Sequence, residues 1–251
     1  MLDSRQCVPI EKQTLCQVAS LNLLPIFCDF ERLPLPYLQF MPDFLIFRTY
    51  RNFVAGVKRM PVRFEELRDR VLGCLTGLAV GDALGAPHRL MNHYSLESRF
   101  PEGIQDMLGG GKSKLAPGQW TAPTAQALVV IESIFANKGF EGIDIAMRLS
   151  SLVDRYREGF GFELREVLEQ LGHDPEKWES ISLKHWYHSG GTFAGNGGLS
   201  RCVPIALTRT GDLQSLVTDT TRAMRITHYD PRCVEAAIVV NFLILQCLYG
   251  Q

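Results

Sequence analysis

Glycine recurs at every fourth position in one stretch of this sequence, at Gly73, Gly77, Gly81 and Gly85. Residues four apart share one face of an α-helix, and the spacing of nearby apolar residues is also helical. These apolar residues are Leu67, Val71, Leu75 and Leu78. The pattern predicts a helix from about residue 62 to residue 85, with a glycine face that a second helix can approach closely. The uncharged part, residues 71–81, is too short to cross a bilayer, which favours a core helix.

Helical periodicity returns in several later segments, whereas strand signals are few. The predicted helices cover residues 123–137, 141–157, 162–171, 212–225 and 231–249. Because 46% of the residues are apolar, the chain can bury a sizeable core. We therefore predict an all-α fold with long glycine-rich loops.

The last predicted helix, residues 231–249, is apolar on most of its sides and must be buried. No later segment of this sequence is there to cover it. Three explanations stay open: another chain covers it by self-association, the N-terminal extension covers it, or the sequence is a fragment.

Residues 1–60 mix aromatic residues with prolines, which rule out a long helix and disfavour central strands. We expect an irregular N-terminal extension over 1–60 and one domain over 61–251. A misassigned start codon explains the extension equally well. The first residues lack the charged and apolar segments of a signal peptide.

Charge and cysteine content exclude several classes of partner and compartment. The net charge is −1 and no basic block occurs, which disfavours nucleic acid and membranes as main partners. The seven cysteines are scattered without any CxxC pair, which favours a reducing compartment, and we expect the protein in the cytoplasm.

Four stretches, taken in order, carry a family resemblance. They read "GLAVGDALGAPHRL" from Gly77, "PGQWTAPTAQAL" from Pro117, "GNGGLSRCVPIAL" from Gly195 and "THYDPRCVEAA" from Thr227. Together they resemble the ADP-ribosylglycohydrolase family, which includes the dinitrogenase-reductase-activating glycohydrolase, over roughly residues 65–251. The resemblance implies an all-α bundle with a cleft at one end, here C-terminally truncated.

The resemblance also implies a chemistry, the hydrolysis of the glycosidic bond between ADP-ribose and a protein side chain. Family members use two Mg²⁺ ions, held in part by the aspartates of a W-T-D-D-T motif. At those two positions this sequence has Ala122 and Pro123, while Thr121 and Thr124 remain as remnants of the metal site. Arg89 stands where some members have a catalytic glutamate, and the sequence ends before the family's C-terminal Asp-x-Asp motif.

Magnesium requires anionic oxygen ligands, which threonine hydroxyls alone do not supply. We therefore expect no metal cofactor and no catalytic residue beyond Asp82, a weak candidate whose carboxylate more often caps or braces a helix. For Thr121 the favoured interpretation is the N-cap of the helix that follows. Residues 218–221, "TDTT", are interpreted as a surface segment, and "HWYH" at 185–188 lacks the partner ligands of a zinc site.

The ADP-ribose-binding elements of the family are kept. They match Gly195, Asn196, Gly197, Gly198 and His228. Glycines let backbone N–H groups approach phosphates and form an anion nest, and Asn196 offers a donor and an acceptor to ribose hydroxyls. Arg201 is expected to pair with a phosphate or with a core carboxylate. A tight turn and a helix-terminal histidine are equally good interpretations of these residues.

The sequence predicts a family member without metal-dependent hydrolysis that binds ADP-ribose or an ADP-ribosylated protein. Two alternatives stay open: an active or altered ADP-ribosyl-acceptor glycohydrolase, and a structural or non-functional fragment.

Overall fold

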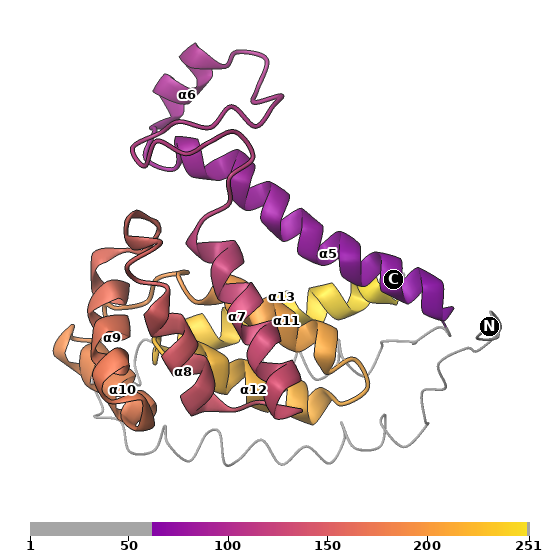
Figure 1. Cartoon of the computed structure of the whole chain (residues 1–251), viewed down its shortest axis with the longest axis vertical. Coiled ribbons are helices and arrows are strands. Elements are labelled where there is room, and N and C mark those ends of the chain that lie inside the picture. Colours follow the sequence, from indigo (N-terminus) through magenta and orange to yellow (C-terminus); the bar gives the residue numbers. More distant parts are fainter. Residues whose placement is uncertain (1–61, 250–251) are drawn as a thin grey trace.

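The computed structural model describes residues 62–249, and the extension predicted over 1–60 lies outside them. Within the described part the chain is all-α, apart from isolated bridge residues such as the pair Gly110 and Leu115. The all-α prediction is thereby confirmed (Figure 1). In chain order the elements are α5 (Phe64–Gly85), η2 (Ala86–His88), α6 (His93–Arg99), α7 (Ala122–Asn137), α8 (Gly142–Ser151), η3 (Arg157–Gly159), α9 (Phe162–His173), η4 (Pro175–Lys177), α10 (Trp178–His188), α11 (Leu199–Thr208), α12 (Leu213–Arg225) and α13 (Pro231–Leu248).

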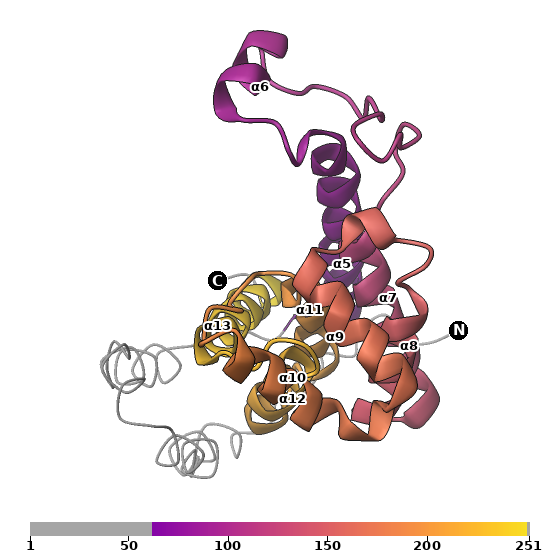
Figure 2. The same cartoon turned by 90° about the vertical axis from the view of Figure 1, so that its left-hand side faces the viewer.

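Helices α7 to α13 form a bundle, and α5 runs along its outside and carries α6 away from it (Figures 1 and 2). The short helix α11 lies at the centre and packs against α7, α12 and α13. Its residues Cys202, Ile205 and Ala206 have no solvent exposure. Six consecutive residues of this ten-residue helix, 201–206, are buried, so its burial has no helical period for the sequence to show.

The glycine stripe of α5 does not receive a second helix among the described residues. A Cβ atom added at Gly73, Gly77, Gly81 or Gly85 would meet no heavy atom within 4 Å. The predicted close approach on this face is therefore wrong for the part of the chain that the structure describes. A repeat of four residues indicates that the glycines share a face, but it does not say which face turns to the core.

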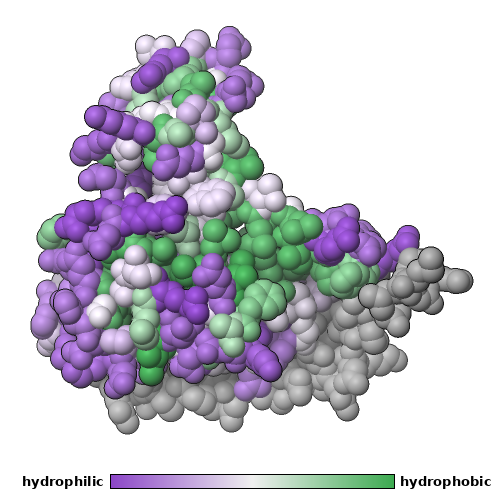
Figure 3. Space-filling model, in the orientation of Figure 1, coloured by the Kyte–Doolittle hydropathy of each residue, from purple (hydrophilic) through white to green (hydrophobic). Residues whose placement is uncertain are grey.

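Helix α5 contacts the bundle through its other side. Leu67 and Val71 pack against the core, and only Ala83 of this helix is fully buried. Leu72 and Val80 stay exposed. In the space-filling view, apolar surface gathers where α5 meets the bundle (Figure 3).

Helix α13 is covered by elements that precede it in the chain. Helices α11 and α12 pack against it, and its buried Asn241 donates to the Cys202 carbonyl at 2.9 Å and to Thr220 Oγ1 at 2.8 Å. Earlier helices therefore bury part of α13, a source of burial that none of the three explanations named, and those explanations stay predictions. Its length and apolar composition would suit a membrane span, a property that core helices share, and 44% of it is buried.

Two smaller predictions also differ from the structure, and a further helix was not predicted. The helix predicted over 141–157 ends at Ser151, and no helix was predicted over α10, Trp178–His188. Residues 218–221 do not form a surface segment, because Asp219, Thr220 and Thr221 are buried. Asp219 accepts a hydrogen bond from Arg209 Nε at 2.8 Å, which accounts for a carboxylate in that position.

Asp82 joins the end of α5 to the start of α7. One carboxylate oxygen accepts the Thr121 hydroxyl at 2.7 Å, and the other accepts the Thr124 hydroxyl at 2.7 Å. The second oxygen also accepts the backbone N–H groups of Thr121 at 2.8 Å and Thr124 at 3.1 Å. Thr121 occupies the N-cap position as predicted, but its own side chain makes no capping bond. Asp82 supplies the cap instead, and its negative charge suits a helix N-terminus.

We predict that Asp82→Ala lowers the free energy of unfolding by about 2 kcal/mol, because a helix cap is lost and two threonine hydroxyls lose their acceptor. Urea denaturation of the full chain measures this change. Asp69→Ala, on the same helix at an exposed position, is the matched control and should change stability by less than about 0.5 kcal/mol. Equal effects of the two substitutions would contradict the role given to Asp82.

Candidate functional site

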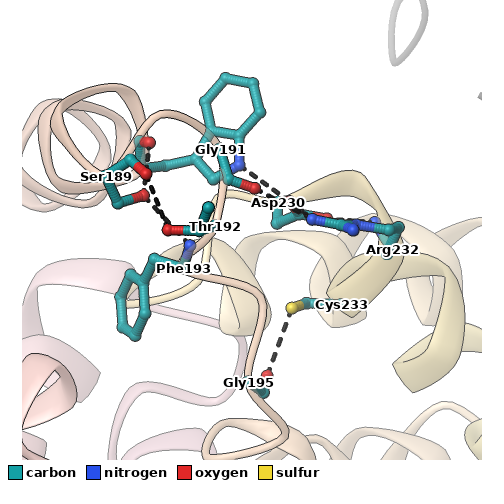
Figure 4. Close-up of polar contacts among 9 residues, drawn as sticks. Ser189, Gly191, Thr192, Phe193, Gly195, Asp230, Arg232 and Cys233 are labelled. Carbon is teal, nitrogen blue, oxygen red and sulfur yellow. Dashed lines mark hydrogen bonds and ion pairs between the residues drawn. The ribbon is translucent and has the colours of Figure 1, made fainter. Parts of the chain in front are cut away.

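The loop between α10 and α11 contains the predicted glycine motif, and α13 holds the start of that loop in place. Arg232 donates to the Gly191 carbonyl at 3.0 Å and to both oxygens of Asp230 (Figure 4). Asp230 also accepts the indole N–H of Trp186, on α10, at 2.8 Å. Burial opposes ionisation of Asp230, but the hydrogen bonds from Arg232 and Trp186 outweigh it and lower the pKa of this carboxyl. The ionised carboxylate therefore connects α10, the loop and α13.

Further contacts fix the middle of the loop. The Thr192 hydroxyl donates to the Ser189 carbonyl at 2.7 Å, and the Phe193 N–H donates to Ser189 Oγ at 3.1 Å. The thiol of Cys233 donates to the Gly195 carbonyl at 3.3 Å (Figure 4). These contacts direct the Phe193 side chain into the core.

His228 lies under the loop, just after α12. Its ring stacks on Phe193 with 4.7 Å between centroids, and Nδ1 lies 2.7 Å from Thr227 Oγ1. Burial, reinforced by the positive charge of Arg201, lowers the pKa of His228 from its usual 6.5 to about 3. The imidazole is therefore neutral at neutral pH.

Two glycines of the loop, Gly197 and Gly198, are required for space rather than for unusual backbone angles. None of residues 195–198 has a positive φ, so the alternation of right- and left-handed residues typical of an anion nest is absent. A Cβ atom at Gly197 would lie 2.8 Å from Leu164 Cδ2. One at Gly198 would lie 2.6 Å from Arg201 Nη2. The glycines therefore let the loop lie directly on the core.

Arg201 is fully buried and, among the described residues, pairs with no carboxylate, in contrast to one of the two expectations for it. It donates to the Ala223 carbonyl at 3.0 Å, to Gln126 Oε1 at 2.9 Å, to the Met224 carbonyl at 3.4 Å and to Thr227 Oγ1. Burial lowers its pKa to about 10, so it stays protonated at neutral pH. Its charge is stabilised by neutral acceptors.

Sequence reasoning missed Gln126 and Thr227, which complete this network. Gln126 accepts from Arg201 and donates to the Gly197 carbonyl at 3.1 Å. It lies on α7 two residues after Thr124, so the first turns of α7 connect the Asp82 cluster to the glycine loop. Both residues stand inside the quoted motifs, but a buried polar contact leaves no periodic signal.

The remaining predicted residues lie at the surface or at the start of α7. Gly195 and Asn196 are exposed, and the Asn196 carbonyl accepts the Leu199 N–H at 3.0 Å. Arg89 donates to the carbonyls of Gly159 at 2.8 Å and Glu158 at 3.1 Å. It thus makes a structural contact where the resemblance places a glutamate.

The described residues do not fit a pair of Mg²⁺ ions. Within residues 62–249, no three His, Cys, Asp or Glu side chains are grouped as metal ligands. The Asp82 carboxylate already accepts four hydrogen bonds, two of them from the Thr121 and Thr124 hydroxyls. A magnesium pair needs several anionic oxygens in octahedral arrangement, which this cluster does not offer.

We predict that Gly198→Ala lowers the free energy of unfolding by about 1–3 kcal/mol, because the new methyl group overlaps the pinned guanidinium of Arg201. Gly195→Ala is the matched control. Its Cβ would lie 3.8 Å from His228 Nε2, an ordinary contact, and stability should be nearly unchanged. Thermal unfolding followed by circular dichroism compares the two, and an equal tolerance for alanine would refute the packing described for Gly198.

We also predict that His228 makes the fold less stable in acid. Between pH 6.5 and about 3 the unfolded chain binds a proton at this side chain and the folded chain does not. Stability therefore falls as the pH falls through this window, by about 1.4 kcal/mol per pH unit. Urea titrations at several pH values test this. His228→Gln should show a shallower pH dependence than the wild-type chain, and parallel curves would contradict the prediction.

Comparisons with known proteins agree with the motifs. The family described as ADP-ribosylglycohydrolase matches residues 64–251. ADP-ribosylarginine hydrolase Tri1 of Serratia proteamaculans is 31% identical over 202 residues, which cover 74% of this chain and 50% of that protein. ADP-ribosyl-[dinitrogen reductase] glycohydrolase of Rhodospirillum rubrum is 30% identical over 193 residues, which cover 74% of this chain and 60% of that protein.

A solved structure shares the fold. It is described as an ADP-ribosylglycohydrolase-related protein complex, with a TM-score of 0.56 and 35% sequence identity, over 74% of this chain and 58% of that one. The chain thus spans 50% and 60% of the length of the two curated relatives. On the family match, the shared motifs and the common fold, this chain belongs to the ADP-ribosylglycohydrolase family.

Proposed function

We propose that this chain binds ADP-ribose at the Gly195–Gly198 loop and has lost metal-dependent hydrolysis. One contrast carries the proposal. Hydrogen bonds from Gln126 and Cys233 hold the loop in place, whereas Ala122 and Pro123 occupy the positions of the family's metal-binding aspartates.

The loop offers the groups that an ADP-ribose ligand needs. Asn196 is exposed at its tip, and its amide supplies a donor and an acceptor for ribose hydroxyls. Beneath the loop lies the cation of Arg201, which no described carboxylate neutralises. A buried charge of this kind acts through a low dielectric and favours an anion such as a diphosphate above it.

The positions of the former catalytic groups are now used for packing. Ala122 is buried against Gly159, and a Cβ atom on that glycine would lie 2.9 Å from the alanine methyl. An aspartate at position 122 would have no room to extend on that side. Arg89 donates to the carbonyl of the same Gly159, the last residue of η3. These contacts support a change of use from catalysis to structure.

A second candidate function is hydrolysis itself. Two relatives that are 30% and 31% identical are named as hydrolases of ADP-ribosyl groups. For hydrolysis, Asp82 would bind magnesium together with further metal ligands from outside the described residues.

Calorimetric titration of ADP-ribose into the full chain, in magnesium and in EDTA, separates the two candidates. Binding of equal affinity in both buffers, without turnover of ADP-ribosylated arginine or serine peptides, is the expected result. No binding at millimolar ADP-ribose would overturn the binding proposal. Turnover that EDTA abolishes would establish the hydrolase instead.

We predict that Asn196→Ala weakens ADP-ribose binding by about tenfold, the equivalent of one hydrogen bond to a polar ligand. The side chain is exposed, so the melting temperature should not change. Gln214→Ala removes an exposed amide from α12 and should leave affinity unchanged. Calorimetry on both variants measures this, and unaltered affinity of Asn196→Ala would remove that residue from the site.

A further inference from the structure

A chain of buried hydrogen bonds runs from Arg201 through Thr227 to His228. Arg201 Nη2 donates to Thr227 Oγ1, and the same hydroxyl lies 2.7 Å from His228 Nδ1. All three side chains are buried. Such a chain has a direction, because guanidinium groups only donate hydrogen bonds whereas a hydroxyl donates one and accepts others.

The direction fixes the position of the histidine proton. Arg201 uses an acceptor site of Thr227 Oγ1, and among the described residues His228 Nδ1 is the one acceptor in hydrogen-bond contact with the hydroxyl. The hydroxyl proton therefore points to Nδ1, and the proton of the neutral imidazole resides on Nε2. The reverse arrangement would leave a buried hydroxyl proton without an acceptor, which disfavours it by about tenfold or more.

The protonated nitrogen faces the glycine loop. His228 Nε2 lies 3.8 Å from the position of a Cβ atom on Gly195 and 3.5 Å from that of one on Gly197. The stacked ring of Phe193 fixes the plane of the imidazole. His228 is 1% exposed, and within residues 62–249 no side chain or backbone group makes a hydrogen bond with Nε2. This N–H lies beside the glycine loop, and Nε2 is not among the fully buried side-chain atoms that lack a hydrogen-bond partner.

We propose that Arg201 and Thr227 are positioning residues that hold His228 in its Nε2–H form, so that the loop presents a neutral N–H donor to an oxygen of the ligand. This inference rests on the proposed function for the identity of the ligand, ADP-ribose, whose phosphate and ribose oxygens are both acceptors. The fixed tautomer itself follows from the hydrogen bonds alone.

Long-range ¹H–¹⁵N correlation spectra of the full chain at pH 7, without ligand, test the tautomer directly. The His228 signals are assigned by their loss in His228→Gln. We expect an unprotonated Nδ1 and a protonated Nε2. An Nδ1–H form, or an average of the two forms, would overturn the proposal. The exposed His173 serves as the reference and should show averaging between both forms.

Two substitutions at Thr227 test the positioning role. Thr227→Val keeps the shape but removes the hydroxyl, so the Nε2–H form should give way to a mixture and ADP-ribose binding should weaken by about tenfold. Thr227→Ser keeps the hydroxyl and should restore both the tautomer and the affinity. A Thr227→Val chain with wild-type tautomer and affinity would contradict the role. If that variant does not fold, the wild-type spectrum still decides the tautomer.

The two proposals fail in different ways. If the wild-type chain shows the Nε2–H form but binds no ADP-ribose, the proposed function and the ligand contact are wrong while the tautomer stands. If ADP-ribose binds and the proton is on Nδ1, the proposed function survives and the positioning role of Arg201 and Thr227 is wrong.

Discussion

The buried guanidinium of Arg201 is the constraint on which the site depends. A cation without a carboxylate partner can remain in a protein interior only if polar groups surround it. Here the acceptors come from three places: Gln126 on α7, the carbonyls at the end of α12, and the hydroxyl of Thr227. The need to satisfy one side chain therefore fixes α7, α11 and α12 relative to one another. The N-cap of α11 must then be a glycine, Gly198, because a Cβ atom there would lie 2.6 Å from Arg201 Nη2.

Two carboxylates complete the arrangement from opposite ends of the chain. Asp230 accepts hydrogen bonds from Trp186 and Arg232 and so ties the loop to α10 and α13. Asp82 caps α7, the helix that carries Gln126. Both carboxylates act by accepting hydrogen bonds from fixed donors, which is a structural use of charge. The Asp82 carboxylate, which stands in the first of the four motifs, thus braces the start of α7.

The sequence predicted the fold class, the family and the course of α7, α12 and α13, because long apolar repeats and ordered motifs are local signals. It also predicted that Asp82 more often serves as a brace. The sequence-based predictions failed for features that depend on which distant segment packs against a residue. Spacing placed the glycines of α5 on one face but could not show that the face is open. Nothing in the sequence pattern indicates that Arg201, Asp219 and Thr220 are buried. Burial of polar residues is decided by partners from distant segments, such as Gln126, 75 positions away from Arg201.

The central claim is that the glycine loop binds ADP-ribose without a metal. The most direct measurement follows the backbone amide resonances of the full chain while ADP-ribose is added in EDTA. If ADP-ribose binds at the loop, the largest shifts fall on residues 195–198, with smaller shifts at the neighbouring His228. Absence of any shift, or shifts centred on Asp82 and Thr121 that require added magnesium, would contradict it.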